Sequence, residues 1–220
     1  MFLWQSGTPA APKQCLVLDI DETLVHTYVD NETKPAQAVL DDPALKGQVY
    51  TITTREGTYW GVKRPHLDEF LDFAYKHFDA VAFWSAGKEG YVNAVVEVIA
   101  PNRPSAFVLN RSHCDEIHDE HVASDGTVSY MPRLWKPLNM VFGNSNYPQF
   151  TRYNTWVLDD RRDYAAENLL NWLEIPPYAP NAKKLLPYDD DYLLQLIDWF
   201  QSPEVAGSSN VLEVNKDWHA

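Results

Sequence analysis

The chain has 220 residues, of which 45% are hydrophobic, and it carries a net charge of −13. This length favours one domain with a single core, the composition excludes a disordered chain, and the acidity argues against direct binding to nucleic acid. No apolar run is long enough to span a membrane, the opening residues lack the features of a secretory signal, and two cysteines, Cys15 and Cys114, do not make a disulfide framework.

We therefore expect an intracellular protein, nuclear or cytoplasmic, with flexible tails at 1–13 and 202–220. Between the tails, unbroken apolar runs indicate buried strands, and apolar residues at helical spacing indicate helices. In chain order, the sequence predicts a strand at 15–20, a β-hairpin at 48–64 turning near Glu56-Gly57, a helix at 65–78 with Pro65 in its first turn, a strand at 80–84, a helix at 88–100, strands at 105–110 and 154–160, and a helix at 192–200 after an acidic start.

The alternation of strands and helices is the order found in parallel α/β sheets. We expect a single domain at 14–201, built on a central parallel β-sheet flanked by helices. In such sheets, ligands bind beyond the carboxyl ends of the strands. Polar residues that directly follow a predicted strand are therefore the candidates for a functional site.

Two aspartates follow the first predicted strand in the stretch "CLVLDIDETLVHT". Residues two apart in extended chain point to the same side, and the roughly 6.5 Å between them leaves room for a phosphoryl group. Asp19 could attack phosphorus, while Asp21 protonates the leaving oxygen and later activates water. The simpler interpretation is an acidic turn that ends the strand.

A second acidic pair, Asp159-Asp160, follows the predicted strand at 154–160. Stability alone does not explain acidic pairs at the ends of two strands, because the carboxylates would repel one another. A shared cation would remove that repulsion, and carboxylate oxygens suit Mg²⁺. The two pairs together therefore predict a magnesium site that handles phosphate.

Two further residues supply groups that phosphoryl transfer needs. Ser85 ends the strand at 80–84 and offers a hydroxyl to a phosphate oxygen, although it could equally cap the next helix. Lys136 lies between predicted strands, and Pro137 prevents it from lying in the middle of a helix. It is the best candidate for a fixed cation, the alternative being a solvated surface lysine.

These motifs together resemble the haloacid dehalogenase superfamily, and more narrowly its FCP/SCP-like branch, the phosphatases of the RNA polymerase II carboxy-terminal domain. The matching stretches are "LVLDIDETLVHT", "VKRPHLDEFLDF", "FWSA", "RSHC", "WKPL" and "LDDRRDY", which run in order through most of the chain. The resemblance implies a HAD-like, Rossmann-like fold, with a β-hairpin after the first motif. It also implies a small insertion, at about 100–132, in place of a large cap.

The resemblance also implies an Mg²⁺-dependent phosphatase for phosphoserine or phosphothreonine in proteins, with the polymerase carboxy-terminal domain as one candidate substrate. The implied roles are Asp19 as nucleophile, Asp21 as acid and base, Thr23 as a supporting residue, Ser85 and Lys136 as phosphate-site residues, Arg111 near the phosphoserine, Asp159 and Asp160 as the fourth-motif pair, and Mg²⁺ shared among Asp19, Asp21 and Asp160.

Other functions are compatible with this fold. The chain could be a catalytically silent scaffold or phosphoprotein-binding module, although the presence of Asp19, Asp21 and Lys136 favours catalysis. It could also be a phosphatase for small metabolites. A dehalogenase would not require the acid that Asp21 supplies. The insertion additionally contains possible zinc ligands, with a spacing that matches no familiar zinc finger: His113, Cys114, His118 and His121.

Overall fold

The computed structural model describes residues 13–28, 47–122, 127–165, 168–180 and 190–219. Of the tail predicted at 1–13, all but Lys13 lies outside the described residues. The strands are β1 (Cys15–Leu18), β2 (Val25–Tyr28), β3 (Val49–Thr53), β4 (Thr58–Lys63), β5 (Ala80–Trp84), β6 (Val108–Leu109), β7 (Asp115–Val122), β8 (Val128–Trp135), β9 (Thr155–Asp159) and β10 (Trp172–Glu174). The α-helices are α2 (Leu67–His77), α3 (Glu89–Ile99), α4 (Tyr192–Gln201) and α5 (Pro203–Ala206), and the 3-10 helices are η2 (Arg111–His113), η3 (Leu138–Met140), η4 (Arg162–Tyr164) and η5 (Leu169–Asn171).

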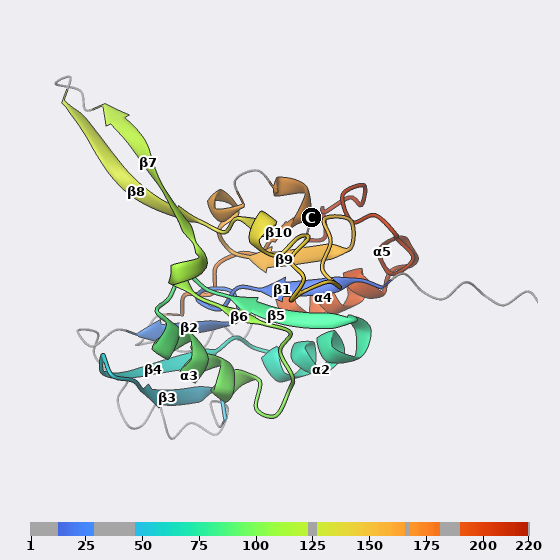
Figure 1. Ribbon diagram of the computed structural model, residues 1–220. Coiled ribbons are helices and arrows are strands. Elements are labelled where there is room, and N and C mark those ends of the chain that lie inside the picture. Colours follow the sequence, from blue (N-terminus) through green and yellow to red (C-terminus); the bar gives the residue numbers. More distant parts are fainter. Residues whose placement is uncertain (1–12, 29–46, 123–126, 166–167, 181–189, 220) are drawn as a thin grey trace, which may run out of the picture.

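A five-stranded parallel sheet forms the centre of the molecule, in the order β10-β9-β1-β5-β6 (Figure 1). β1 lies between β5 and β9, and Leu18 is in register with Phe83 on one side and Leu158 on the other. The predicted α/β fold with a central parallel sheet is confirmed. Because the strands are parallel, the carboxyl ends of β1, β5 and β9 meet at one edge of the sheet.

The two faces of this sheet are covered differently. Leu16 and Leu18 on β1 pack into the core cluster that contains the buried faces of α2, α3 and α4. Their neighbours Cys15 and Val17 point to the opposite face, as alternation along a strand requires. That face is covered by η3 and by the loop that follows it up to residue 150. The segment is a loop because the Gly, Asn and Pro residues of 143–148 do not favour a helix.

The predicted hairpin of 48–64 is present as β3 and β4, and β2 joins it in a three-stranded sheet ordered β2-β4-β3. Gly61 allows the close packing of this sheet, because a Cβ there would lie 2.5 Å from the Tyr50 ring and 2.7 Å from the His26 carbonyl oxygen. The ring of Tyr50 therefore crosses Gly61 and reaches β2, where its hydroxyl lies 2.6 Å from Thr27 Oγ1.

The helix boundaries agree with the predicted segments, with two local differences. α2 begins at Leu67, so Pro65 precedes the helix instead of lying in its first turn. At the start of α4, the acidic residues do not cap the helix with their side chains. Asp190 instead accepts a 2.9 Å hydrogen bond from the Nε of Arg64, which is fully buried.

The insertion forms a long antiparallel hairpin of β7 and β8, which the sequence did not predict. Its two strands pair from Asp115 with Trp135 to Val122 with Val128, and the hairpin projects away from the central sheet (Figure 1). The hairpin continues past Pro132, where the sequence placed the end of the insertion. Its last residue, Trp135, directly precedes Lys136.

The segment 202–219, for which the sequence predicted a loose tail, is packed against the domain. Val205, Val211 and Trp218 are buried in the main core cluster. The Gln14 side chain donates a 2.8 Å hydrogen bond to the Val205 carbonyl and so ties this segment to the start of β1. Apolar side chains spaced along the segment explain the difference, because their burial offsets the entropy lost on ordering.

Within the described ranges, no helix combines the length and the apolar character that crossing a membrane would need.

Candidate active site

The first acidic motif lies at the carboxyl end of β1. The Asp19 N–H donates a 2.9 Å hydrogen bond to the Leu158 carbonyl on β9, and the Asp19 side chain is buried. Ile20 packs in the main core, so the side chains of Asp19 and Asp21 point away from it. The chain then turns at Glu22, whose φ of 56° is in the left-handed region that non-glycine residues seldom adopt.

Lys136 brings a positive charge directly onto this motif. Its Nζ lies 2.6 Å from Asp19 Oδ1 and 2.7 Å from Asp159 Oδ2, and its side chain is 1% exposed. Burial alone would lower the pKa of Lys136, but the charges and hydrogen bonds of Asp159 and Asp19 outweigh burial and raise it. The ammonium group therefore stays protonated, and Lys136 is not a solvated surface lysine.

Asp159 and Asp160 follow β9 and have different partners. Asp159 is fully buried, and its two oxygens accept hydrogen bonds from Lys136 Nζ and from the Arg161 N–H, the latter at 2.7 Å. Burial raises the pKa of Asp159, and Lys136 opposes that shift. The Asp160 N–H donates to Thr23 Oγ1 at 3.0 Å, and this bond holds the two acidic motifs together.

Carboxylate oxygens of Asp19, Asp159 and Asp160 lie within 4.8 Å of one another, and among the described residues this is the one group of potential metal ligands. Burial, followed by the charge of Asp19, raises the pKa of Asp160 to about 7. An all-oxygen set of mutually repelling carboxylates fits a hard cation such as Mg²⁺. Because Asp159 already accepts two hydrogen bonds, Asp19 and Asp160 have the more available oxygens.

Asp21 lies outside this group and has neutral partners. The Ser85 hydroxyl donates a 2.9 Å hydrogen bond to Asp21 Oδ2, and the Tyr91 hydroxyl donates to Asp21 Oδ1. Burial, with a further contribution from the charge of Asp19, raises the pKa of Asp21 to about 6. Asp21 can therefore exchange a proton near neutral pH, which is what a general acid and base requires.

Ser85 occupies the expected edge of the sheet, at the end of β5, but it does not cap α3. The N-terminal cap position of α3 is Lys88, which provides no side-chain hydrogen bond. The Ser85 oxygen accepts a 2.9 Å hydrogen bond from the Gly87 N–H while its hydroxyl donates to Asp21. The structure thus connects Ser85 to the acidic motif instead of to the helix.

Tyr91 belongs to a chain of hydroxyl groups that the sequence did not reveal. It projects from α3, and its hydroxyl lies 2.6 Å from Thr27 Oγ1, which in turn lies 2.6 Å from the Tyr50 hydroxyl. Burial raises the pKa of Tyr91, so this hydroxyl keeps its proton and remains a donor to Asp21. From the sequence, a tyrosine in an amphipathic helix is expected to be a packing residue. Only the folded structure brings the Tyr91 hydroxyl to Asp21.

Arg64 holds the backbone of the first motif in place through hydrogen bonds. Its Nη1 donates a 3.0 Å hydrogen bond to the Thr23 carbonyl, and its Nη2 donates a 2.8 Å hydrogen bond to the Pro176 carbonyl. The guanidinium also lies 5.6 Å from the ring centroid of Tyr178 and 5.5 Å from that of Tyr192. A buried arginine whose three nitrogens all donate hydrogen bonds fixes the loop that carries Thr23.

Arg111 lies at the same edge but does not contact the carboxylates. It begins η2, its side chain is exposed, and its N–H donates a 2.8 Å hydrogen bond to the Gly87 carbonyl in the loop after Ser85. Its predicted role beside a phosphoserine remains a prediction.

The zinc alternative gains no support from the described part of the insertion. The ring of His113 accepts a hydrogen bond from the Asn110 N–H at 3.3 Å, and His118 Nε2 lies 3.4 Å from Glu116. Burial raises the pKa of the Cys114 thiol, which disfavours the thiolate that zinc requires. The side chain of His121 lies outside the described residues.

The sequence of this chain is similar to a known protein family and to individual proteins. A family model described as NLI interacting factor-like phosphatase matches residues 14–211. A CTD phosphatase-like protein of invertebrate iridescent virus 6 is 24% identical over 169 residues, which are 74% of this chain and 85% of the viral protein. CTD small phosphatase-like protein 1 of Caenorhabditis elegans is 28% identical over 171 residues, which are 74% of this chain but 31% of that protein.

Among solved structures, the fold resembles that of Fcp1, described as an essential RNA polymerase II CTD phosphatase. The TM-score is 0.54 at 17% sequence identity, and the match covers 93% of this chain and 59% of that chain. Fission yeast Fcp1 bound to beryllium fluoride gives a TM-score of 0.53 at 18% identity, covering 86% of this chain and 51% of the other. At this identity, the likeness shows a shared fold.

Proposed function

The chain belongs to the NLI interacting factor-like phosphatase family, and we propose that it is an Mg²⁺-dependent protein phosphatase for phosphoserine and phosphothreonine. The proposed reaction passes through an acyl phosphate of Asp19, that is, a phosphoaspartate. The observation that carries the proposal is the difference between the two aspartates of the first motif. Asp19 accepts a hydrogen bond from the Lys136 ammonium group, whereas Asp21 is held by two neutral hydroxyls.

In the first step, Asp19 attacks the phosphorus atom. Its Oδ1 accepts the hydrogen bond from Lys136, and no hydrogen bond to its Oδ2 occurs within the described residues, so Oδ2 is the free nucleophile. The bond between phosphorus and the serine or threonine oxygen breaks as the new bond forms. Protonated Asp21 gives its proton to the departing oxygen, which avoids the release of an alkoxide.

In the second step, a water molecule attacks the phosphorus atom of the phosphoaspartate. Asp21, now a carboxylate, takes a proton from this water. The bond between phosphorus and Asp19 Oδ2 breaks, releasing phosphate and restoring both aspartates. The raised pKa of Asp21, about 6, suits both directions of proton transfer. The acid is strong enough to donate its proton to the leaving oxygen, and the carboxylate is basic enough to accept a proton from water.

The carboxylates of Asp19 and Asp160 would hold Mg²⁺, with Asp159 beside them. When bound, Mg²⁺ would offset the negative charge that the carboxylates and the phosphoryl group bring together. Lys136 would serve the same purpose, because its ammonium group is already fixed between Asp19 and Asp159.

A phosphorylated protein is the proposed substrate, and the carboxy-terminal domain of RNA polymerase II is one candidate. The family description and the names of the relatives support a phosphatase of this kind. A hollow of about 310 Å³ opens beside Asp21, lined in part by Tyr59, Lys88 and Glu56. Such an open site suits a side chain presented by a polypeptide. An intracellular location, nuclear or cytoplasmic, is part of the same proposal.

A test is phosphate release by the purified chain from a panel of peptides phosphorylated on serine, threonine or tyrosine, including repeats of the polymerase domain. We expect hydrolysis of phosphoserine and phosphothreonine peptides, its loss in excess chelator, and its recovery on adding Mg²⁺. The Asp19→Asn variant serves as the control for contaminating phosphatases. Tight binding of phosphopeptides without any turnover would instead indicate a silent binding module, and strict dependence on zinc would contradict the metal assignment.

A further inference from the structure

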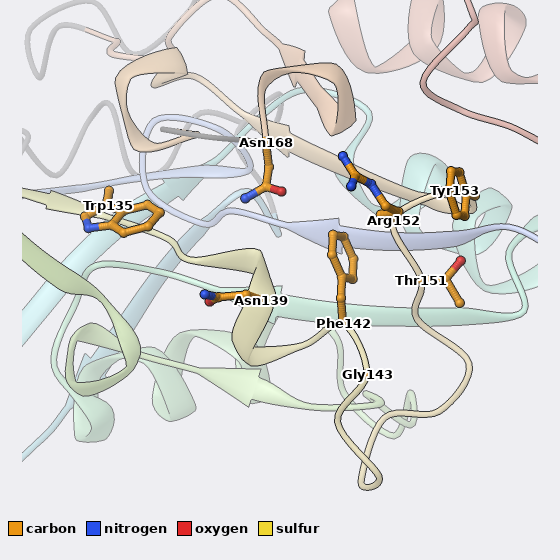
Figure 2. Close-up of a pocket in the computed structure, with 8 residues that line it drawn as sticks. All are labelled: Trp135, Asn139, Phe142, Gly143, Thr151, Arg152, Tyr153 and Asn168. Atoms are coloured by element: carbon orange, nitrogen blue, oxygen red, sulfur yellow. The ribbon is translucent and has the colours of Figure 1, made fainter.

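A groove of about 490 Å³ lies apart from the catalytic carboxylates (Figure 2). One wall is the segment that follows Lys136, with Asn139 and Phe142, and the other carries Asn168 and Arg152. In Figure 2, Trp135 lies at one end of the groove and Tyr153 at the other, with the amides of Asn139 and Asn168 between them. Aromatic rings beside amide groups are suited to a polypeptide, because rings pack on apolar side chains and amides bond to its backbone.

The charge of the groove is opposite in sign to the net charge of the protein. The whole chain has 31 acidic and 18 basic residues, yet among the residues that the structure describes Arg152 is the one charged residue that lines the groove. Arg152 forms no ion pair with any residue that the structure describes, and its guanidinium lies 5.9 Å from the ring centroid of Tyr153. An arginine left without a carboxylate in so acidic a protein favours a negatively charged partner.

Exposed apolar side chains are concentrated around the same groove. Among the described residues, six large hydrophobic side chains are exposed, and four of them either line the groove or lie within two positions of a lining residue in the sequence. These four are Met140, Tyr153, Leu169 and Leu170, with exposed fractions of 39%, 54%, 42% and 58%. Clustered apolar exposure of this kind marks a surface that another polypeptide covers.

Both ends of the groove are connected through the chain to residues of the catalytic site. Trp135 directly precedes Lys136, whose ammonium group contacts Asp19. At the far end, Tyr153 lies two residues before β9, and Asp159 at the end of β9 contacts the same ammonium group. Asp159 lies six positions after Tyr153 in a largely extended stretch of chain, which corresponds to roughly 20 Å. A substrate segment of about six extended residues could therefore reach from the phosphorylated residue to Arg152.

We propose that this groove binds an extended, acidic segment of the phosphoprotein substrate, with an Asp or Glu carboxylate paired to Arg152. The segment would lie about six residues from the phosphorylated residue. The proposal rests on the proposed function and names a feature of its substrates. A carboxylate suits the groove better than a second phosphate, because a single guanidinium, the one cation among the described lining residues, matches a single negative charge.

Direct binding tests the groove without any need for catalysis. The probe is an unphosphorylated, fluorescein-labelled peptide rich in Glu and Leu, and the measurement is fluorescence anisotropy at low salt. We expect Arg152→Glu to weaken binding about tenfold or more. The matched control is Arg55→Glu, which makes the same charge change at an exposed residue of the turn between β3 and β4. Equal affinity of the two variants for the probe would overturn the proposal.

Kinetics test the link to the active site. Phosphoserine peptides carrying a Glu cluster at increasing distances from the phosphoserine are compared with the same peptides carrying Gln. We expect a lower KM for the Glu peptides, greatest at a spacing of about six residues, and loss of this advantage in Arg152→Glu but not in Arg55→Glu. An advantage that requires a second phosphoserine in place of Glu would contradict the assignment of a carboxylate.

The outcomes separate this proposal from the proposed function. Arg152-dependent peptide binding without hydrolysis of any phosphopeptide would reject the phosphatase assignment and keep an acidic-peptide groove. Hydrolysis that ignores the acidic cluster, together with unchanged probe binding, would reject the groove alone. Light scattering tests the remaining possibility, that the groove binds a second copy of the chain. A dimer that Arg152→Glu converts to a monomer would assign the groove to self-association and overturn the proposal.

Discussion

Lys136 Nζ donates a 2.6 Å hydrogen bond to Asp19 Oδ1, although the two residues lie 117 positions apart in the chain. A second carboxylate, on Asp159, accepts from the same ammonium group at 2.7 Å. All three side chains are almost completely buried. The positive charge therefore holds together two carboxylates that would otherwise repel each other in a region from which water is largely excluded.

Replacing this lysine should destabilise the protein in a pH-dependent way. We expect Lys136→Met to lower the free energy of unfolding by about 3–5 kcal/mol at neutral pH, because two buried carboxylates lose their partner. The loss should shrink as the pH is lowered from 7.5 to 5, because burial raises the pKa of Asp159 and protonation of its carboxylate removes the repulsion. Thermal unfolding of both proteins across this pH range measures the difference. A loss that stays constant with pH would mean that packing, and not charge, explains the effect.

Removing the proposed nucleophile should abolish turnover without unfolding the protein. An amide cannot form the acyl phosphate, so we expect Asp19→Asn to reduce kcat on phosphoserine peptides by at least about 10³-fold. Phosphate release measures the activity, and thermal unfolding confirms that the fold is retained. Activity within a few-fold of the unchanged protein would contradict the role of Asp19.

Replacing Asp21 should matter according to the leaving group. Nitrophenolate leaves readily without a proton, whereas a serine alkoxide does not, so Asp21→Asn should slow the phosphoserine reaction by about 10²–10⁴-fold and the nitrophenyl phosphate reaction much less. The rates must be single-turnover rates of phosphoaspartate formation at saturating Mg²⁺, because attack by water also depends on Asp21. Equal losses for both substrates would show that Asp21 positions the site without donating a proton.

The metal-free protein should lose stability as the pH rises from about 4 to 7. Burial and the charge of Asp19 raise the pKa of Asp160 from 3.8 to about 7, so in this range the folded state binds more protons than the unfolded state. Stability then falls with rising pH. In chelator, we expect Asp160→Asn to reduce the fall in melting temperature between pH 5 and 7.5.

The control for this prediction is Asp217→Asn, which removes an exposed carboxyl far from β9 in the sequence. Mg²⁺ should restore stability at pH 7.5 to the unchanged protein and less to Asp160→Asn, because the metal binds the folded state. A pH dependence identical in the two variants would mean that Asp160 does not titrate in this range.

The sequence by itself determined the central sheet and the location of the chemistry. Unbroken apolar runs such as Cys15–Leu18 can be buried only as strands covered on both faces, and the aspartates that follow them must then lie at one edge of a parallel sheet. The predicted residues at three strand ends, Asp19, Ser85 and Asp159, do lie at that edge. Local pattern is sufficient here because strand direction and side-chain alternation fix where a residue points.

Only the tertiary structure decided how these residues differ. Asp19 and Asp21 are two similar carboxylates in the motif, and tertiary contacts make Asp19 the partner of the Lys136 ammonium group and Asp21 the partner of the neutral Tyr91 hydroxyl. Tertiary contacts also packed the segment containing Trp218 and opened the groove at Arg152. These features depend on distances between residues far apart in the chain, and neither periodicity nor composition encodes which distant side chain fills the space beside a given carboxylate.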